Sequence, residues 1–147
     1  MGNAMVREMG LDGHVIICGY GVVGQKVAEV LIERNVHFAI IEMDPKKVEH
    51  LKEQGYNVIE GDATLSRVLK NAGIETAKAI AVVLDDDAKT LFTVLAAHDL
   101  NKRLFIAARA NDEFVREKLV EVGADYIVMP QRTASKEIVS EIVKSKA

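Results

Sequence analysis

The sequence feature that most constrains the fold is an alternation of short apolar runs with stretches of helical periodicity. The runs are rich in β-branched residues and apolar on both faces, as is typical of strands inside a parallel sheet that helices cover on each side. They are HVIIC (14–18), HFAIIE (37–42), YNVIE (56–60), AIAVVL (79–84), LFIAA (104–108) and DYIVM (125–129). The stretches between them have helical spacing over 23–34, 45–54, 65–72, 88–100 and 112–122. The alternation predicts a doubly wound α/β fold with six parallel strands.

Turn and capping residues occur at the predicted ends of these helices. A glycine follows three of the predicted helices, at the position where a left-handed residue ends a helix: Gly55, Gly73 and Gly123. Asp44 precedes Pro45, a pattern that favours a helix start. The other capping candidates are Thr64, Asp86 or Asp87, and Asn111. Because no linker interrupts these elements, residues 14–130 are expected to form one lobe.

The two ends lie outside that lobe. Residues 1–13 are mixed and methionine-rich, and we expect them to be an N-terminal linker or tail. Residues 131–147 contain an amphipathic helix over 131–146 with no strand after it; its apolar side carries Ala134, Ile138, Val139, Ile142 and Val143. This helix either packs on its own sheet or crosses to a partner or second lobe.

Composition and charge exclude several classes of protein. The 147 residues include 19 Lys and Arg against 22 Asp and Glu, so the net charge of −3 argues against nucleic acid as a main partner. No apolar run approaches the roughly 18 residues of a membrane span, and the N-terminus lacks a signal-peptide pattern. The single cysteine, Cys18, has no disulfide partner within the chain. A reduced, cytoplasmic setting is expected.

A glycine-rich loop follows the first predicted strand and opens the next helix. It reads Gly19-Tyr20-Gly21-Val22-Val23-Gly24. In a G-x-G-x-x-G loop the first glycine permits the tight turn, the second lets the backbone approach a pyrophosphate, and the third allows close packing of helix on sheet. The N–H groups and positive dipole end of the helix then hold the phosphates. The loop therefore predicts a dinucleotide site.

Acidic residues follow the second and third predicted strands. Glu42, at the end of the second strand, can accept from both ribose hydroxyls and repels a 2′-phosphate, so NAD is favoured over NADP. Met43 and Asp44 come next, and Asp44 is either a helix cap or a ligand contact. The segment Asp62-Ala63-Thr64 follows the third strand and either faces the adenine end or forms a plain turn.

Charged residues also follow the fourth and fifth strands. Asp85, Asp86 and Asp87 raise the possibility of a metal site, but adjacent side chains point in different directions, so helix capping is favoured. Asp85 and Arg109 are included among the candidate ligand contacts; Arg109 either meets a phosphate or pairs with an acid. The four histidines are scattered, and Cys18 has no histidine partner, so no catalytic group is predicted.

Read in order, ICGYGVVG, AIIEMD, GDAT, VVLDDD, IAARA and GADYIVMP resemble the regulator-of-potassium-conductance family, also called the RCK, KTN or TrkA N-terminal domain. The resemblance covers residues 14–130. It implies a Rossmann-like lobe that dimerises, assembles into rings beside membrane-embedded potassium channels or transporters, and binds NAD(H), adenosine phosphates or, in some members, calcium. Its phosphate loop falls on Gly19, Gly21 and Gly24, its ribose acid on Glu42, and its adenine-side loop on 62–64. It makes 131–146 a crossover helix. The apolar residues around the 88–100 helix suit it either to burial against a neighbouring subunit or to ordinary burial within its own lobe.

Three positions depart from the family pattern. Val22 stands where many relatives carry a basic residue that reaches a terminal phosphate, which weakens the case for ATP. Arg109 and Asn111 stand where calcium-gated relatives place acids, and Thr90 replaces the usual asparagine.

The leading hypothesis is a non-enzymatic domain at the inner face of the cell membrane that regulates a potassium channel or transporter. It is expected to bind NAD(H), with ADP, AMP or ATP as further candidates. The alternatives are the dinucleotide-binding half of an NAD-dependent dehydrogenase and an assembly module with a vestigial site.

Overall fold

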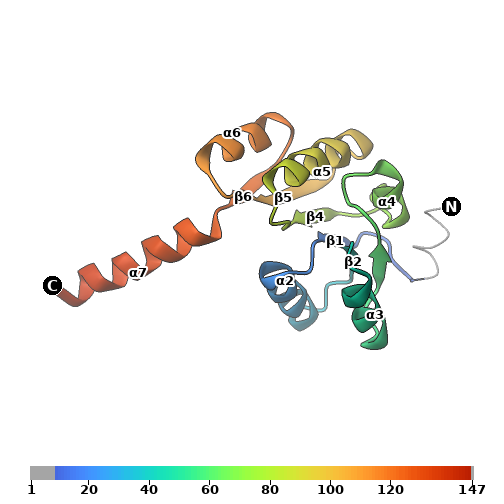
Figure 1. Ribbon diagram of the computed structural model, residues 1–147, viewed down its shortest axis with the longest axis horizontal. Helices are drawn as coiled ribbons and strands as arrows, with labels where there is room; N and C mark the ends of the chain where they lie inside the picture. Colours follow the sequence, from blue (N-terminus) through green and yellow to red (C-terminus); the bar gives the residue numbers. More distant parts are fainter. Residues whose placement is uncertain (1–8, 147) are drawn as a thin grey trace.

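The computed structural model describes residues 9–146, and its centre is one parallel sheet of six strands (Figure 1). The strands are β1 (Val15–Cys18), β2 (Phe38–Glu42), β3 (Val58–Glu60), β4 (Ala79–Val82), β5 (Phe105–Arg109) and β6 (Tyr126–Val128). Their spatial order is β3-β2-β1-β4-β5-β6, and all neighbouring pairs are parallel. The predicted Rossmann-like sheet is therefore confirmed, with its change of direction between β1 and β4.

Helices cover both faces of the sheet (Figure 1). The covering helices are α2 (Val22–Glu33), α3 (Pro45–Glu53), α4 (Ser66–Asn71), α5 (Asp87–Leu100) and α6 (Glu113–Glu121), and α7 (Pro130–Lys146) follows them along the chain. Side chains of α2 and α3 pack with Val15 and Ile17 of β1, whereas side chains of α4, α5 and α6 pack with Ile16 and Cys18. Because alternate residues of β1 enter opposite layers, the strand is apolar on both faces, as its sequence predicts.

The predicted helix ends are largely confirmed. Gly55, Gly73 and Gly123 follow α3, α4 and α6 with φ of +88°, +78° and +116°. Asn35, with φ of +57°, follows α2, where the sequence has no glycine to indicate a left-handed residue. Asp44 accepts from the Lys46 N–H at 3.0 Å and so caps α3.

Two predicted caps are wrong. Thr64 does not cap α4: the capping position is Leu65, and the Thr64 hydroxyl donates instead to the Asp62 carboxylate at 2.7 Å. Asn111 does not cap α6: Asp112 accepts from the Val115 N–H at 2.9 Å. The sequence offers adjacent polar residues at both sites, and the choice between them depends on which other groups each side chain meets.

The C-terminal helix α7 extends away from the sheet (Figure 1). Its side chains from 131 to 145 are all exposed, so it does not pack on its own sheet. One ion pair links it to the rest of the described chain: the Arg132 guanidinium lies 2.9 Å from the Glu113 carboxylate of α6. Within residues 9–146, no helix has both the length and the apolar character required to cross a membrane.

The predicted N-terminal tail (1–13) lies partly outside the described residues, since these begin at Met9. Leu11 is buried, and the Gly13 N–H donates to the Thr76 carbonyl at 2.8 Å. Residues 11–13 are thus held against the lobe.

Candidate functional site

A crevice opens at the carboxyl ends of β1, β2 and β4, where the strand order changes direction. It contains a cavity of about 200 Å³. The residues that line it are Gly19, Ile41, Glu42, Met43, Gly61, Asp62, Ala63, Leu84, Asp85, Asp86 and Lys89. In open α/β sheets this is the position at which ligands bind.

The three glycines of the loop meet different steric conditions. Gly19 has φ of +95°, and a Cβ there would lie 3.0 Å from Leu84 Cδ2. A Cβ on Gly24 would overlap the Gly19 carbonyl oxygen, so this glycine is required by the packing of α2 on the loop. A Cβ on Gly21 would meet no atom within 4 Å among the described residues. Gly21 therefore adjoins open space, as a phosphate cradle requires.

Gly21 is also the N-cap of α2, and as a glycine it has no side chain that could accept a hydrogen bond from the first turn of the helix. The first N–H groups of a helix have no acceptor within the helix itself. These donors and the positive end of the α2 dipole are therefore available to a phosphate next to Gly21.

Glu42 connects the glycine loop to the end of β2. One carboxylate oxygen accepts from the Tyr20 N–H at 3.0 Å, and the other accepts from the Asp44 N–H at 2.9 Å. Both bonds fix the orientation of a half-buried carboxylate that lines the cavity. Each oxygen retains a lone pair, which suits this group to accept from the two hydroxyls of a ribose.

Asp62 follows β3, the strand paired with β2, and is organised by its own turn. Its carboxylate accepts from the Thr64 N–H at 2.9 Å and from the Thr64 hydroxyl. The backbone hydrogen bond is the largest cause that lowers the pKa of Asp62, followed by the bond from the hydroxyl. Asp62 therefore stays ionised at neutral pH.

A polar network follows β4 and β5. The Arg109 guanidinium lies 3.3 Å from the Asp85 carboxylate, and the Arg109 side chain is only 17% exposed. Asn111 donates to the Asp85 carbonyl at 2.9 Å and to the Asp87 carboxylate at 3.0 Å. Asp86 caps α5 through the Lys89 N–H. Within the described residues, no three histidine, cysteine or carboxylate groups converge as metal ligands would.

The structure brings only part of the predicted site to the cavity wall. The predicted residues that line it are Gly19, Glu42, Met43, Asp62, Ala63 and Asp85. The other predicted residues lie outside its wall: Tyr20, Gly21, Val22, Val23, Gly24, Asp44, Thr64 and Arg109. Five wall residues were not predicted: Ile41, Gly61, Leu84, Asp86 and Lys89. The first four lie at or close to a predicted strand end, which is a signal in the sequence, whereas Lys89 lies within a predicted helix and has no such signal.

Tyr20 points away from the crevice toward the α3 side of the sheet. Its ring centroid lies 6.2 Å from that of Tyr56, and both residues line a second cavity with α2 and α3. Burial, followed by the neighbouring Tyr56, raises the pKa of Tyr20. Tyr20 therefore contributes its backbone N–H to the Glu42 contact and its ring to packing.

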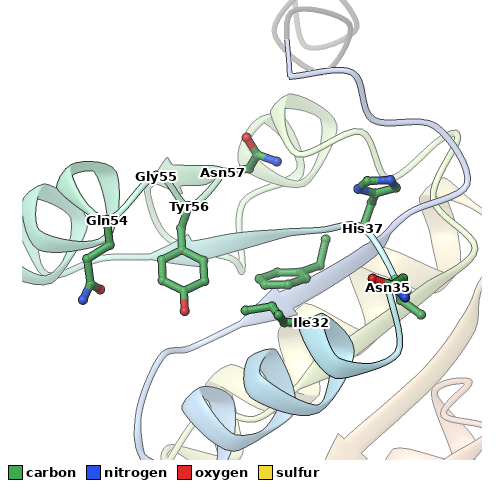
Figure 2. Close-up of a pocket in the computed structure, with 9 residues that line it drawn as sticks. Ile32, Asn35, His37, Gln54, Gly55, Tyr56 and Asn57 are labelled. Carbon is green, nitrogen blue, oxygen red and sulfur yellow. The ribbon is translucent and has the colours of Figure 1, made fainter.

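A larger cavity, about 710 Å³, lies at the amino end of β2 (Figure 2). Ile32, His37, Gln54 and Tyr56 are among the residues that line it, and none of its wall residues is an Asp, Glu, Lys or Arg. It lies at the other end of β2 from Glu42 and offers no charged group for a nucleotide phosphate. The smaller crevice is thus the candidate site.

Two groups that could serve as catalysts, His14 and Cys18, lie buried in the core. The ring of His14 is buried and hydrogen-bonded through Nε2 to the Ala72 carbonyl at 2.8 Å. Cys18 is fully buried, and burial raises the pKa of its thiol well above the usual range. A buried neutral thiol is a poor nucleophile.

Comparison with known proteins decides the family. The sequence pattern of the TrkA-N domain matches residues 15–130. The chain belongs to the TrkA-N domain family. The resemblance inferred from the sequence motifs is therefore confirmed.

Two curated proteins related to this TrkA-N domain are named as potassium channels. It is 40% identical over 136 residues to "Potassium channel protein 1" of Methanocaldococcus jannaschii, covering 91% of this chain and 41% of that protein. It is 31% identical to the "Voltage-gated potassium channel Kch" of Escherichia coli, covering 90% of this chain and 33% of that protein. The TrkA-N domain thus spans less than half the length of these relatives.

Solved structures share the fold. The TrkA-N domain of the inner membrane protein ybaL from Escherichia coli has a TM-score of 0.85 at 25% identity, over 88% of this chain and 96% of that one. The GsuK channel bound to NAD has a TM-score of 0.74 at 26% identity, over 80% of this chain and 21% of that one. The Shewanella denitrificans Kef C-terminal domain in its AMP-bound form has a TM-score of 0.80 at 26% identity, over 91% and 81%.

Proposed function

We propose that this TrkA-N domain binds NAD(H) in the crevice between β1, β2 and β4 and regulates a potassium channel or transporter at the inner face of the cell membrane. The observation that carries the proposal is the open space at Gly21 beside a crevice that Glu42 lines. Related structures hold NAD in GsuK and AMP in the Kef domain, which supports an adenine nucleotide here. ADP, AMP and ATP remain secondary candidates.

The residues present fit a dinucleotide. The N–H groups of the first turn of α2 would hold its diphosphate, and the Glu42 carboxylate would accept from the adenosine ribose. Asp62 and Ala63 would face the adenine side. Val22, which is 79% exposed, offers no cation to a terminal phosphate, so a triphosphate binds here with less affinity than it would beside a basic residue. The bound nucleotide would shift the population of shapes that the assembled domain adopts, and the pore would respond to that shift.

Calorimetry on nucleotide-free protein tests the ligand. We expect NAD⁺ or NADH to bind wild-type protein and Glu42→Ala to bind it at least about tenfold more weakly, since the ribose loses a charged acceptor. Glu49→Ala is the matched control, because Glu49 is an exposed carboxylate on α3 outside the cavity wall. Absence of binding of any adenine nucleotide at millimolar concentration would refute the proposal.

We also infer that α7 and α5 mediate assembly into a dimer or a larger ring. Ile138, Val139, Ile142 and Val143 of α7 are 53% to 62% exposed, although helix–helix association is the usual way to bury such a stripe. On α5 the exposed apolar residues are Phe92 and Leu95. The inference supports an oligomeric regulator that acts on a membrane-embedded subunit.

Light scattering of the eluting protein measures this assembly. The double change Ile138→Asp with Ile142→Asp is expected to yield monomers, because charges on the stripe cannot be buried against a partner. Ser140→Asp adds a charge to the same exposed helix outside the stripe and is expected to leave the mass unchanged. Equal masses for all three proteins would show that α7 has no part in assembly.

A further inference from the structure

The wall of the nucleotide crevice is strongly acidic. Among the residues that the structure describes, four carboxylates line it, from Glu42, Asp62, Asp85 and Asp86, and Lys89 is the one lysine or arginine in the wall. Arg109 is not in the wall and is already paired with Asp85. A ligand with a negatively charged diphosphate therefore meets negatively charged side chains along this wall, except at Lys89.

Lys89 reaches across the crevice. Its ammonium lies 3.8 Å from the thioether sulfur of Met43. Met43 follows β2 and Lys89 lies on α5, which follows β4, and β1 lies between these two strands in the sheet. The Lys89 side chain thus spans the carboxyl end of β1, where Gly19 and the phosphate loop begin, and it lines the same cavity as Gly19.

The backbone of Lys89 is held in place by hydrogen bonds, whereas its ammonium forms no ion pair with the described residues. The Lys89 N–H donates to the Asp86 carboxylate at 3.1 Å, and the Lys89 carbonyl accepts from the Thr93 hydroxyl at 2.7 Å. Among the described residues, Lys89 takes part in no ion pair. The ammonium also helps to lower the pKa of Asp62, after the larger effect of the Thr64 hydrogen bonds, so its field reaches the residues that follow β3.

We propose that Lys89 is the residue that recognises the diphosphate of the nucleotide, in place of the basic residue that the loop lacks at Val22. The inference rests on the proposed function, since it concerns the ligand of that site. An ammonium on a flexible stem is suited to binding phosphate oxygens as a point charge. Lys89 therefore makes the site select diphosphate-containing adenine ligands, such as NAD⁺ and ADP, over adenosine.

Lys89→Met tests the proposal, because methionine keeps most of the unbranched side chain but removes the charge. Dissociation constants for NAD⁺, ADP and adenosine are measured by calorimetry on this variant, on Lys89→Arg and on wild type. Lys102→Met is the matched control: it removes an exposed lysine just beyond the other end of the same helix. A thermal melt of each protein establishes that the variants fold like wild type.

We expect Lys89→Met to bind NAD⁺ and ADP at least about tenfold more weakly and adenosine within about twofold of wild type. Lys89→Arg is expected to retain most of the affinity, and Lys102→Met all of it. Unchanged affinity of Lys89→Met for ADP and NAD⁺, or an equal loss for adenosine, overturns the role of Lys89 while leaving the nucleotide site standing. Failure of wild type to bind any of the three ligands overturns the proposed function, and this inference with it.

Discussion

Alanine substitutions at Gly21 and Gly24 separate the phosphate cradle from the packing of the loop. At Gly24 the new methyl would overlap the Gly19 carbonyl oxygen and lie 3.5 Å from Val83 Cγ2. Overpacking against backbone costs about 3 kcal/mol, and the higher helix propensity of alanine returns about 1 kcal/mol. A net loss of about 2 kcal/mol lowers Tm by about 4–8 °C in a chain of this size.

At Gly21 the same methyl meets no atom of residues 9–146 within 4 Å, and the backbone is extended, with φ of −85°. Alanine stabilises by about 0.4–1 kcal/mol through the unfolded chain and costs a similar amount as a poorer N-cap. The net change stays within about 1 kcal/mol, so Tm moves by at most about 4 °C. The methyl nevertheless occupies the space of a phosphate, so we expect NAD⁺ to bind at least about tenfold more weakly.

Differential scanning calorimetry and binding calorimetry on the two variants provide the measurements. The reasoning predicts opposite patterns: Gly24→Ala loses stability, and Gly21→Ala loses affinity while remaining stable. Wild-type affinity in a stable Gly21→Ala protein would refute the assignment of the loop as the phosphate site. An unchanged Tm for Gly24→Ala would refute the steric argument.

Three further outcomes follow from single side chains. Glu42→Gln should lose about 1–2 kcal/mol of stability, seen as a lower denaturation midpoint, because the amide presents a donor to one of the N–H groups that the carboxylate accepts. Cys18 should resist a thiol reagent in the native protein and react once denaturant unfolds it, since burial raises its pKa; rapid native labelling would contradict this. The pKa of Tyr20 is raised in the folded state. Its contribution to folding stability is therefore fully present below its unfolded-state pKa, near 10, and is lost as the pH rises through its folded-state pKa. Tyr20→Phe should flatten the fall in stability measured above about pH 10. An unaltered dependence of stability on pH would contradict this role of Tyr20 ionisation.

Much of the fold is predictable because it depends on local patterns. Apolar runs with both faces buried define the strands of a parallel sheet, and the positive φ at Gly55 and Gly123 ends helices where the sequence places a glycine. The capping errors at Thr64 and Asn111 have a different origin. Both side chains form hydrogen bonds to groups outside the helix start, and for Asn111 the partners are 24 and 26 residues away in sequence.

Some residues of the site can likewise be predicted from local sequence patterns, and others cannot. Its glycine loop and Glu42 are visible in the sequence because the geometry of a strand followed by a helix requires those residue types at fixed spacing. The wall position of Lys89 is not visible, because it depends on β1 lying between β2 and β4, which brings the first turn of α5 opposite Met43. The orientation of α7 is likewise decided by tertiary structure: its amphipathic pattern is local, but only the packed lobe shows that its own sheet does not cover it. Sequence determined the elements and the loop chemistry, since these follow from neighbours along the chain. Tertiary structure decided which charges meet, since that depends on the order of strands in space.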